Sequence, residues 1–308
     1  MDGVLVIDKP EGPTSHDVVA TARRALGEKR IGHTGTLDPL ATGVLPLVLG
    51  RATRLVRFLT ASDKDYDATI LFGVTTDTLD VTGEETSRPG GAPSREALAA
   101  ALRAFDGEQM QVPPAYSAKK VGGRRAYDFA RRDEPVELAA VPVRVSRLEL
   151  IESGNNRCRL SLTCSAGFYV RALVRDLGER CGTGATLEAL RRTRSGEFTI
   201  DEAIPLDALR TVTGAAEGRD DDRRGPADLE TLLIPMERLL TSFPAVTVTT
   251  EGLTRVSHGQ HVRPSDVSGA LPPASSEWVR VLDAGGTLVA LGTPQRPSGS
   301  LHPEVVLI

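Results

Sequence analysis

Short apolar runs bounded by turn residues recur along the chain and predict β-strands. One run alternates apolar and polar residues, which places Cys158, Leu160, Leu162 and Cys164 on one face. It follows an earlier run through a Gly-Asn-Asn turn, as in an antiparallel hairpin. The predicted strands cover residues 4–8, 44–50, 66–72, 141–151 and 157–164.

Apolar residues three and four positions apart predict helices between these strands. Ser15 and Ser94 stand at the start of two such stripes as expected N-caps, and Gly27 ends the first helix. The predicted helices cover residues 15–26, 51–59, 94–105 and 169–181.

The C-terminal part of the chain has a different pattern. Residues 214–228 are rich in charge and poor in apolar residues, which is typical of a flexible surface loop or linker. Beyond Phe243 the apolar runs are short, and a Gly-Gly turn at Gly285 predicts a hairpin. The length of 308 residues fits two domains of roughly 150 residues each. We expect a larger domain and a small β-rich one, over residues 1–240 and 245–308.

The charge of the chain is distributed unevenly. With 37 Lys and Arg against 41 Asp and Glu, the formal net charge is −4, which excludes a uniformly basic nucleic-acid coat. Residues 119–132 nevertheless contain six cationic residues and one acid, together with Tyr127 and Phe129. Such a segment is either a solvated helix face or a surface on which cations contact phosphates and rings stack on bases. Its cations are Lys119, Lys120, Arg124, Arg125, Arg131 and Arg132.

The sequence does not support a membrane, secreted or disulfide-linked protein. No apolar run reaches the roughly 20 residues of a membrane helix, and the N-terminus carries Asp2 without a cationic signal region. Cys158 and Cys164 lie about 20 Å apart along one strand, beyond the roughly 7 Å reach of a disulfide. No histidine stands at ligand spacing from the cysteines, so zinc is not expected. We expect a cytoplasmic protein whose thiols, Cys181 included, are buried.

The loop at residues 30–43 holds the most candidate chemistry. It brings His33 and Asp38 together with three glycines and a proline, between two apolar elements. A carboxylate on such a loop is either presented to a substrate or caps the Asp-Pro turn. Arg171, near an apolar helix stripe, is either a snorkelling surface side chain or a buried cation that needs a carboxylate partner. Taken alone, His33 and Tyr66 are compatible with structural roles.

Motifs for common cofactors are absent from the sequence. It has no GxxxxGK[ST] phosphate loop, no dinucleotide-binding GxGxxG, no HExxH and no GxSxG nucleophile elbow. We therefore expect chemistry carried by side chains, without a cofactor or a metal.

Several segments together match one known family. Residues 32–43 read GHTGTLDPLATG, and this stretch resembles the signature of the TruB family of pseudouridine synthases. The resemblance continues in the family's order over residues 3–240, and the twelve-residue loop is its most specific part. The other matching segments are Asp8-Lys9-Pro10 with Gly12 and Thr14-Ser15, Lys64-Asp65-Tyr66, Pro113-Pro114-Ala115-Tyr116-Ser117-Ala118-Lys119, Gly167-Phe168-Tyr169-Val170-Arg171 and Leu190-Arg191-Arg192.

The resemblance implies an isomerase that converts uridine 55 in the T arm of tRNA to pseudouridine. The N1–C1′ bond of one uridine breaks, the uracil turns, and C5 joins C1′, so the resemblance implies neither cofactor nor metal. The implied fold is α+β, with a mixed, largely antiparallel central sheet, flanking helices and a small PUA-like C-terminal domain that binds RNA. The expected partner is tRNA. We expect a monomer with no membrane association and no obligatory protein partner.

The resemblance also implies roles by position. Asp38 is the expected catalytic aspartate, Arg171 its ion-pair partner, and Tyr66 the residue that stacks on the target uracil and assists proton removal from C5. The target base must be flipped out of the T loop, and His33 is expected to fill the space that the flipped bases leave. The other expected RNA contacts are Lys9, Tyr169 and Leu190 in the pocket, and Lys119, Lys120, Arg124 and Arg125 in a basic insertion over residues 113–140.

One position departs from the family pattern, and three other functions remain open. Phe168 stands where the family usually has Thr, so we expect altered packing of the pocket. A guide-RNA-dependent synthase of the dyskerin type would share the catalytic loop but need partner proteins. A tRNA-binding chaperone would need no catalysis. A glycoside hydrolase is a weaker alternative because it would need a second catalytic carboxylate.

Overall fold

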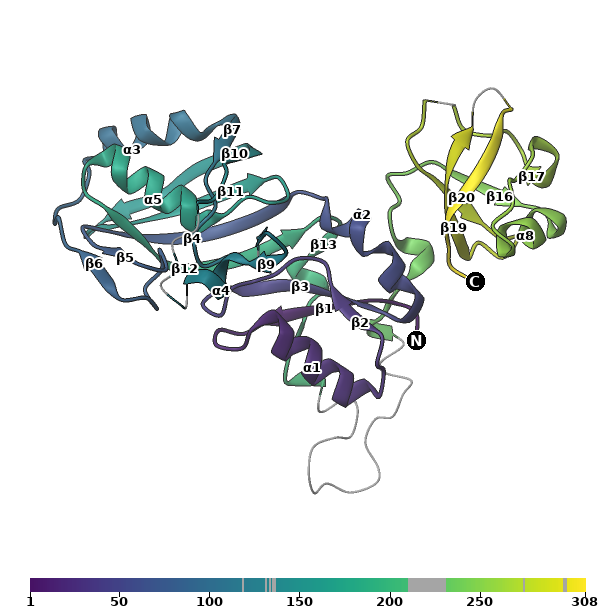
Figure 1. Cartoon of the computed structure of the whole chain (residues 1–308), viewed down its shortest axis with the longest axis horizontal. Helices are drawn as coiled ribbons and strands as arrows, with labels where there is room; N and C mark the ends of the chain where they lie inside the picture. Colours follow the sequence, from purple (N-terminus) through teal and green to yellow (C-terminus); the bar gives the residue numbers. More distant parts are fainter. Residues whose placement is uncertain are drawn as a thin grey trace, which may run out of the picture.

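Most of the chain is built around one large mixed sheet (Figure 1). The computed structural model describes residues 1–308 except 118, 131, 133, 135–136, 210–230, 274 and 296–297. Within these residues the sheet has 11 strands, and its main path runs β14-β1-β3-β12-β4-β11-β10-β7. In that order the strands are Ile204–Pro205, Gly3–Lys9, Thr42–Leu49, Ala185–Ser195, Lys64–Phe72, Arg157–Cys164, Val141–Gly154 and Gly107–Gln111.

The pairing within this sheet is mostly antiparallel. Among its described pairs, β1–β14 and β3–β12 are parallel and the others run antiparallel. Three short strands pair beside the main path: β2 with β3, β13 with β12, and β15 with β1, spanning Ile31–His33, Phe198–Thr199 and Ile234–Pro235. The predicted α+β fold with a mixed, largely antiparallel sheet is therefore confirmed.

Two strands show how the sequence builds this sheet. β3 is apolar along most of its length and buried on both faces, as expected of a central strand. β11 alternates as predicted and buries the face that carries Cys158 and Cys164, whose thiols are free. The hairpin of β10 and β11 turns at Asn155 and Asn156, which both adopt positive φ.

Three helices share one hydrophobic cluster with the large sheet. α3 and α5 lie side by side on the sheet, and α1 covers the part near β1 and β2 (Figure 1). These helices span Ser15–Leu26 for α1, Arg95–Leu102 for α3 and Val170–Cys181 for α5, and a 3-10 turn, Arg103–Phe105, extends α3. Three of the four predicted helices are thus confirmed, and Ser94 caps α3 as expected.

Three local predictions need correction. Thr14, not Ser15, caps α1: its backbone is extended, and its hydroxyl accepts the backbone N–H of Asp17 at 3.1 Å. The helix predicted over residues 51–59 is a 3-10 helix, Gly50–Leu55, followed by the short α2, Val56–Thr60. The loop predicted over 30–43 begins with the strand β2, because its backbone pairs with β3, a contact that local patterns do not reveal.

The C-terminal unit has its own five-stranded sheet in the order β17-β16-β18-β19-β20. These strands are Val267–Ser268, Ala245–Val248, Val279–Leu282, Leu288–Gln295 and Ser300–Val306. One helix, α8, Thr250–Ser257, and a 3-10 turn, Pro264–Asp266, accompany the sheet, and a separate cluster of valines forms the core. The predicted hairpin is present as β18 and β19.

The C-terminal unit packs against the large sheet. Leu288, Leu291 and Leu307 belong to a hydrophobic cluster that includes Val4 and residues of β3 and α2. Aromatic rings extend this contact, with Trp278 edge-on to Phe58 of α2 at 4.7 Å between centroids. The linker predicted at 214–228 lies outside the described residues.

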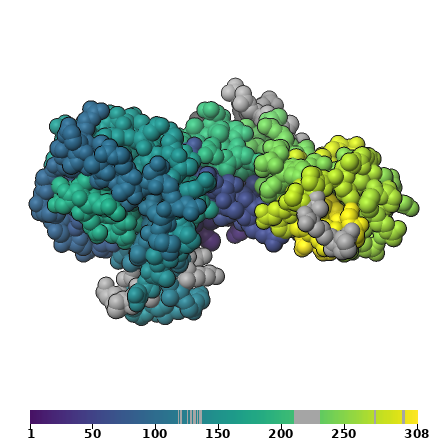
Figure 2. All heavy atoms as spheres, turned by 90° about the horizontal axis from the view of Figure 1, so that it is seen from above, coloured from purple at the N-terminus to yellow at the C-terminus, as the bar shows by residue number. Residues whose placement is uncertain are grey.

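Smaller elements project from the large sheet or close its edges. A hairpin, β8 and β9 (Lys120–Val121 and Arg124–Arg125), leads into the short α4, Ala126–Ala130, and this segment projects from the body in Figure 2. The other small elements are β5 (Thr75–Thr76), β6 (Glu85–Ser87) and the 3-10 turns Ile200–Glu202 and Met236–Arg238. None of the described helices is long and apolar enough to cross a membrane.

Candidate active site

The loop that carries Asp38 is held by buried hydrogen bonds. The hydroxyl of Ser15 accepts the N–H of Leu37 at 2.8 Å and donates to its carbonyl at 3.0 Å. The N–H of Gly12 donates to the Pro39 carbonyl at 2.9 Å, and the Asp38 carbonyl accepts a turn hydrogen bond. These bonds fix the backbone and leave the Asp38 carboxylate available for other contacts.

The Asp38 carboxylate pairs with Arg171. Arg171 Nε donates to Asp38 Oδ2 at 2.8 Å, and the side chains are 6% and 37% exposed. The two terminal guanidinium nitrogens donate to the carbonyls of Thr78 and Tyr116, each at 2.8 Å. Arg171 is therefore the buried cation with a carboxylate partner, not a snorkelling surface residue. The expected contact between these two residues is present, and one face of Asp38 remains open to solvent.

A second carboxylate, which the sequence analysis missed, lies behind Arg171. Asp80 Oδ2 is 3.8 Å from Arg171 Nε, and the Asp80 side chain is almost fully buried. Its other oxygen accepts the Thr82 N–H at 3.0 Å and the Thr78 hydroxyl at 2.9 Å. The local signal, an acid in a polar loop with several acids, did not distinguish Asp80 from its exposed neighbours.

Tyr66 lies on β4 beside this pair and is 8% exposed. Burial raises the pKa of its hydroxyl, and the charge of Asp38 adds to the rise, whereas Arg192 opposes it. The phenol is therefore protonated at neutral pH and close enough to Asp38 to sense its charge. Arg192, its neighbour on β12, is almost completely buried and was not singled out from the sequence.

Lys9 is hydrogen-bonded to the loop that carries Asp38. It is fully buried, and its Nζ donates to the carbonyls of Pro10 at 2.8 Å and Pro39 at 3.3 Å. Burial lowers its pKa to about 8, partly offset by Asp38. Lys9 thus holds the Asp38 turn by its backbone.

The other expected pocket residues lie on elements that also carry the groups described above or adjoin the Asp38 loop. Tyr169 precedes α5, and its backbone exchanges two hydrogen bonds with the buried Gln111, of 2.8 and 3.1 Å. Leu190 is buried on β12, and His33 ends β2, where its Nδ1 accepts the Gly35 N–H at 3.3 Å. The sequence did not indicate a role for Gln111, because one polar residue at the end of a short strand carries no recognisable signal.

The basic insertion connects to the site through its backbone. The Tyr127 N–H donates to the Ser117 carbonyl at 3.1 Å, next to the Tyr116 carbonyl that Arg171 binds. Arg124 is exposed and lies over the Phe129 ring at 4.3 Å from its centroid. Of the other expected RNA-contacting cations, Lys119 donates to the Ala139 carbonyl at 3.3 Å, and the side chains of Lys120 and Arg125 lie outside the described atoms.

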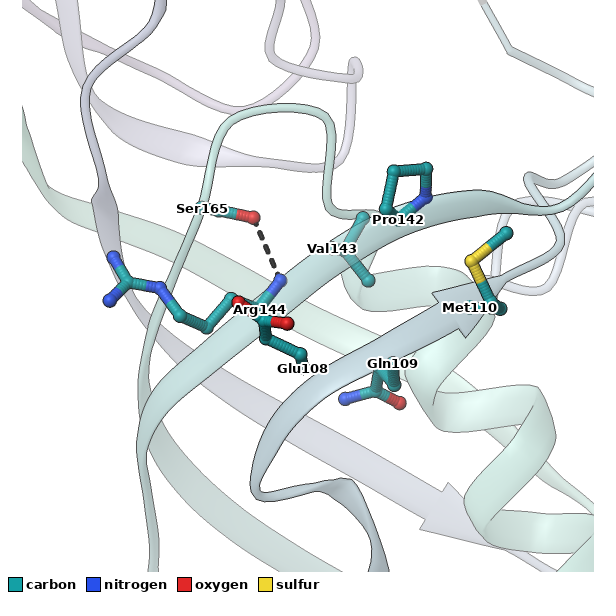
Figure 3. A pocket seen from close by; sticks show the side chains of 7 residues that line it. All are labelled: Glu108, Gln109, Met110, Pro142, Val143, Arg144 and Ser165. Atoms are coloured by element: carbon teal, nitrogen blue, oxygen red, sulfur yellow. Dashed lines mark hydrogen bonds between the residues drawn. The ribbon is translucent and has the colours of Figure 1, made fainter.

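A surface hollow lies elsewhere, along the edge of the large sheet. Its volume is about 460 Å³, and Figure 3 shows its lining: Glu108, Gln109, Met110, Pro142, Val143, Arg144 and Ser165. None of the predicted site residues lines it. In the part of the chain that the structure describes, no group of three or more metal-ligating side chains occurs. Phe168 is partly buried and packs against the main core.

Comparison of the sequence with protein families finds two matches. A profile described as TruB family pseudouridylate synthase (N terminal domain) matches residues 23–170, and one described as tRNA pseudouridylate synthase B C-terminal domain matches residues 171–241. The boundary between them divides one sheet, since β12 inserts between β3 and β4.

Similar proteins have related names. The chain is 44% identical over its full length to tRNA pseudouridine synthase B of Solibacter usitatus, which it covers completely. It is 39% identical to the protein of that name from Burkholderia mallei, covering all of this chain and 97% of that one. A Mycobacterium relative of the same name is 43% identical over 89% of each chain.

Solved structures also resemble this one. The archaeal box H/ACA sRNP Nop10-Cbf5 complex contains a chain with a TM-score of 0.74 and 25% identity, covering 99% of this chain and 86% of that one. A chain of a Cbf5-Nop10-Gar1 complex has a TM-score of 0.74 and 26% identity, covering 99% and 85%.

Proposed function

The chain belongs to the TruB family of pseudouridylate synthases, and we propose that it isomerises uridine 55 in the T arm of tRNA to pseudouridine. The observation that carries the proposal is the ion pair of Asp38 with the buried Arg171, on a loop of the expected sequence. Full-length relatives named tRNA pseudouridine synthase B support tRNA as the substrate.

The reaction conserves atoms and electrons. The N1–C1′ bond breaks and C5 bonds to C1′, while C5 loses one proton and N1 gains one. The net change is an isomerisation, so it needs no oxidant, reductant or group donor.

Asp38 is proposed to act on the target uridine, as the carboxylate that is open to solvent. A carboxylate can serve there as a nucleophile or as a base. Arg171 orients it, because the guanidinium is fixed by carbonyls on two further loops and presents Nε in one direction. Losing the partner of a buried arginine is costly, so the pair also secures the loop.

Tyr66 is proposed to stack on the flipped uracil and to assist removal of the C5 proton. Its place beside Asp38 and within the large sheet gives it a fixed orientation. Lys9, Tyr169 and Leu190 shape the pocket, and His33 fills the space that the flipped bases leave in the T loop. Flipping is required because the reacting atoms are otherwise stacked inside the loop.

Two outer parts of the molecule are proposed to bind the rest of the RNA. The basic insertion over residues 113–140, with Lys119, Lys120, Arg124 and Arg125, contacts phosphates. The C-terminal unit over residues 245–308 serves as a PUA-like RNA-binding domain. We propose that the enzyme acts as a cytoplasmic monomer.

Product mapping on a tRNA transcript tests this proposal. Purified protein without cofactor or partner protein should convert uridine 55 alone and release tritium from C5-labelled uridine. A bound but unmodified transcript would instead support a chaperone, and free uracil would indicate a hydrolase.

The same assay addresses a guide-dependent synthase. The similarity to chains of the box H/ACA sRNP Nop10-Cbf5 complex and the Cbf5-Nop10-Gar1 complex raises this second possibility. Turnover of the bare transcript by the isolated chain would exclude it.

A further inference from the structure

Arg192 is a buried cation with no ion-pair partner among the residues that the structure describes. Its side chain is 1% exposed and among the largest that are fully buried. Within the described part of the chain, no carboxylate oxygen lies within 4.0 Å of its guanidinium nitrogens. A buried charge is normally paired because desolvation is costly. The retention of Arg192 at this position therefore calls for a function.

The guanidinium joins β12 to both ends of the catalytic loop. Its Nε donates to the Val44 carbonyl at 2.7 Å and its Nη2 to the Gly35 carbonyl at 3.1 Å. Gly43 and Arg192 are register partners, and a Cβ on Gly43 would lie 2.2 Å from the Arg192 carbonyl. Arg192 thus sets where the loop that carries Asp38 begins and ends.

On the opposite side, Arg192 faces Tyr66. The two residues are register partners on β12 and β4, and Arg192 lowers the pKa of the phenol by its charge and by a hydrogen bond. Asp38 and Cys164 act in the other direction. Arg192 therefore lies between the two groups that the proposed reaction uses, the carboxylate loop and the tyrosine.

A second buried cation adds to the same local charge. Lys64 is on β4, two residues before Tyr66, and its Nζ donates to the carbonyls of Thr60 and Ser62. Burial and the charge of Arg192 lower its pKa to about 8. Two buried like charges that repel each other are unfavourable in a protein interior, and their presence together favours an electrostatic role over packing alone.

We propose that Arg192 is a positioning residue that fixes Tyr66 against the Asp38 loop and supplies the positive charge that stabilises the phenolate, the form that accepts the C5 proton after the phenol has given its own proton to solvent. The proposal rests on the proposed function, because it concerns the step in which C5 loses its proton. Arg192 touches neither sugar nor base; it acts through Tyr66 and through the loop backbone.

Variants of Arg192 separate this role from simple stabilisation. Arg192→Met keeps the length of the side chain and removes its charge, and Arg192→Lys keeps the charge and loses the planar fork. Arg280→Met is the matched control, since Arg280 is another buried arginine that donates to a backbone carbonyl, in the C-terminal sheet. Each protein is mixed in single turnover with tRNA transcript that carries protium or deuterium at C5 of uridine.

We expect Arg192→Met to slow product formation by on the order of 100-fold with little change in the dissociation constant for tRNA. Its deuterium isotope effect should exceed that of the unmodified protein, because C5 deprotonation becomes rate-limiting. Arg192→Lys should recover part of the rate and show a smaller isotope effect.

Two results would overturn the inference. One is a rate for Arg192→Met no lower than that of Arg280→Met, and the other is an isotope effect equal to that of the unmodified protein. Should Arg192→Met fail to fold, Arg192→Lys decides by the same two criteria. Absence of turnover by the unmodified protein would instead contradict the proposed function.

Discussion

Arg171 joins three segments that are far apart in the sequence. Its guanidinium contacts Asp38, the Thr78 carbonyl and the Tyr116 carbonyl, so each nitrogen has a partner on a different loop. The carboxylate of Asp38, the proposed catalytic group, is therefore oriented by the same guanidinium that holds the loops around it. A substitution that keeps the hydrogen bond to Arg171 can therefore test the charge of Asp38 without removing the support of the loop.

The first prediction concerns Asp38 itself. Asp38→Asn keeps the shape of the side chain and its ability to accept from Arg171 but removes the negative charge. Pseudouridine formation should fall by on the order of 10⁴-fold or more, as for loss of an essential nucleophile or base. Binding of a T-arm hairpin, measured by filter retention, should survive.

Asp65→Asn is the control for this variant. Asp65 is also paired with an arginine, Arg194, at 2.8 Å, but the expected chemistry does not use it. Normal turnover by Asp38→Asn, or an equal loss in Asp65→Asn, would contradict the assignment.

The second prediction uses the buried amine of Lys64. Its pKa in the folded protein is about 8 against an ordinary 10.5, so the unfolded chain binds more protons between these values. The free energy of unfolding therefore rises as pH increases from 8 to 10.5. Below pH 8 the amine is charged in both states, and burying this charge lowers the free energy of unfolding by about 3 kcal/mol.

Lys64→Met should reveal this dependence in urea unfolding. The free energy of unfolding of the variant, relative to that of the unmodified protein, should be highest near pH 7 and fall as pH approaches 10.5. A difference between the two proteins that does not change with pH would show that the amine is not desolvated.

Residue-level prediction from sequence succeeds where a group belongs to a continuous motif. The sequence predicts the pairing of Asp38 with Arg171, because both residues stand in segments that match a family. It does not single out Asp80 or Gln111, which stand in no matching segment, and it includes Arg192 in a matching segment without revealing that its side chain is buried and bound to backbone carbonyls. No local pattern distinguishes a buried polar side chain of this kind from an exposed one.

At the scale of elements, the crossing of β3 and β12 positions the loop that carries Asp38. Gly43 has a φ of 99°, a conformation that side chains with a Cβ rarely adopt, and the Arg192 backbone occupies the space where a Cβ would lie. Because the two backbones approach closely at Gly43, β12 can pair in parallel with the first residues of β3, which directly follow the loop.

The third prediction follows from this crossing. Gly43→Ala should lower the free energy of unfolding by at least about 3 kcal/mol, since backbone strain adds to a clash that no side chain can relieve. Gly27→Ala is the matched control: Gly27 also has positive φ, of 61°, but open space around it, so about 1 kcal/mol is expected. Equal losses in urea unfolding would show that the crossing tolerates a wider separation.

Elements with strong local signals are predictable, and those that depend on distant pairing are not. The β10–β11 hairpin follows from its alternation and its Asn turn. The insertion of β12 between β3 and β4, and the strand β2, depend on contacts between segments that are distant in sequence. Periodicity along one strand carries no information about such neighbours.

At the scale of the whole molecule, the net charge of −4 conceals an uneven distribution. The projecting insertion is basic, whereas the loop around Asp80 is acidic. Among the described residues, five further cations lie inside the protein: Lys9, Lys64, Arg171, Arg192 and Arg280. RNA binding therefore depends on local placement of charge, which composition alone does not report.

The last prediction concerns the contact between the two units. Trp278 packs against Phe58, and Arg57 lies over both rings, so this contact fixes the C-terminal unit against α2. Trp278→Ala should weaken the contact by about 2 kcal/mol, less than for a fully buried tryptophan because the ring is half-exposed.

Loosening this contact should affect long RNA more than short RNA. If the C-terminal unit binds tRNA outside the T arm, Trp278→Ala should weaken binding of whole tRNA several-fold and leave binding of a T-arm hairpin unchanged, because only the first ligand reaches both units. Leu253→Ala removes a side chain from the separate core of the C-terminal unit and serves as the control. In Trp278→Ala, amide hydrogen exchange should increase in β18 to β20 near the contact with α2. In Leu253→Ala it should increase around α8. Equal losses for both RNAs in Trp278→Ala would mean that the C-terminal unit stabilises the catalytic sheet and does not extend the RNA-binding surface.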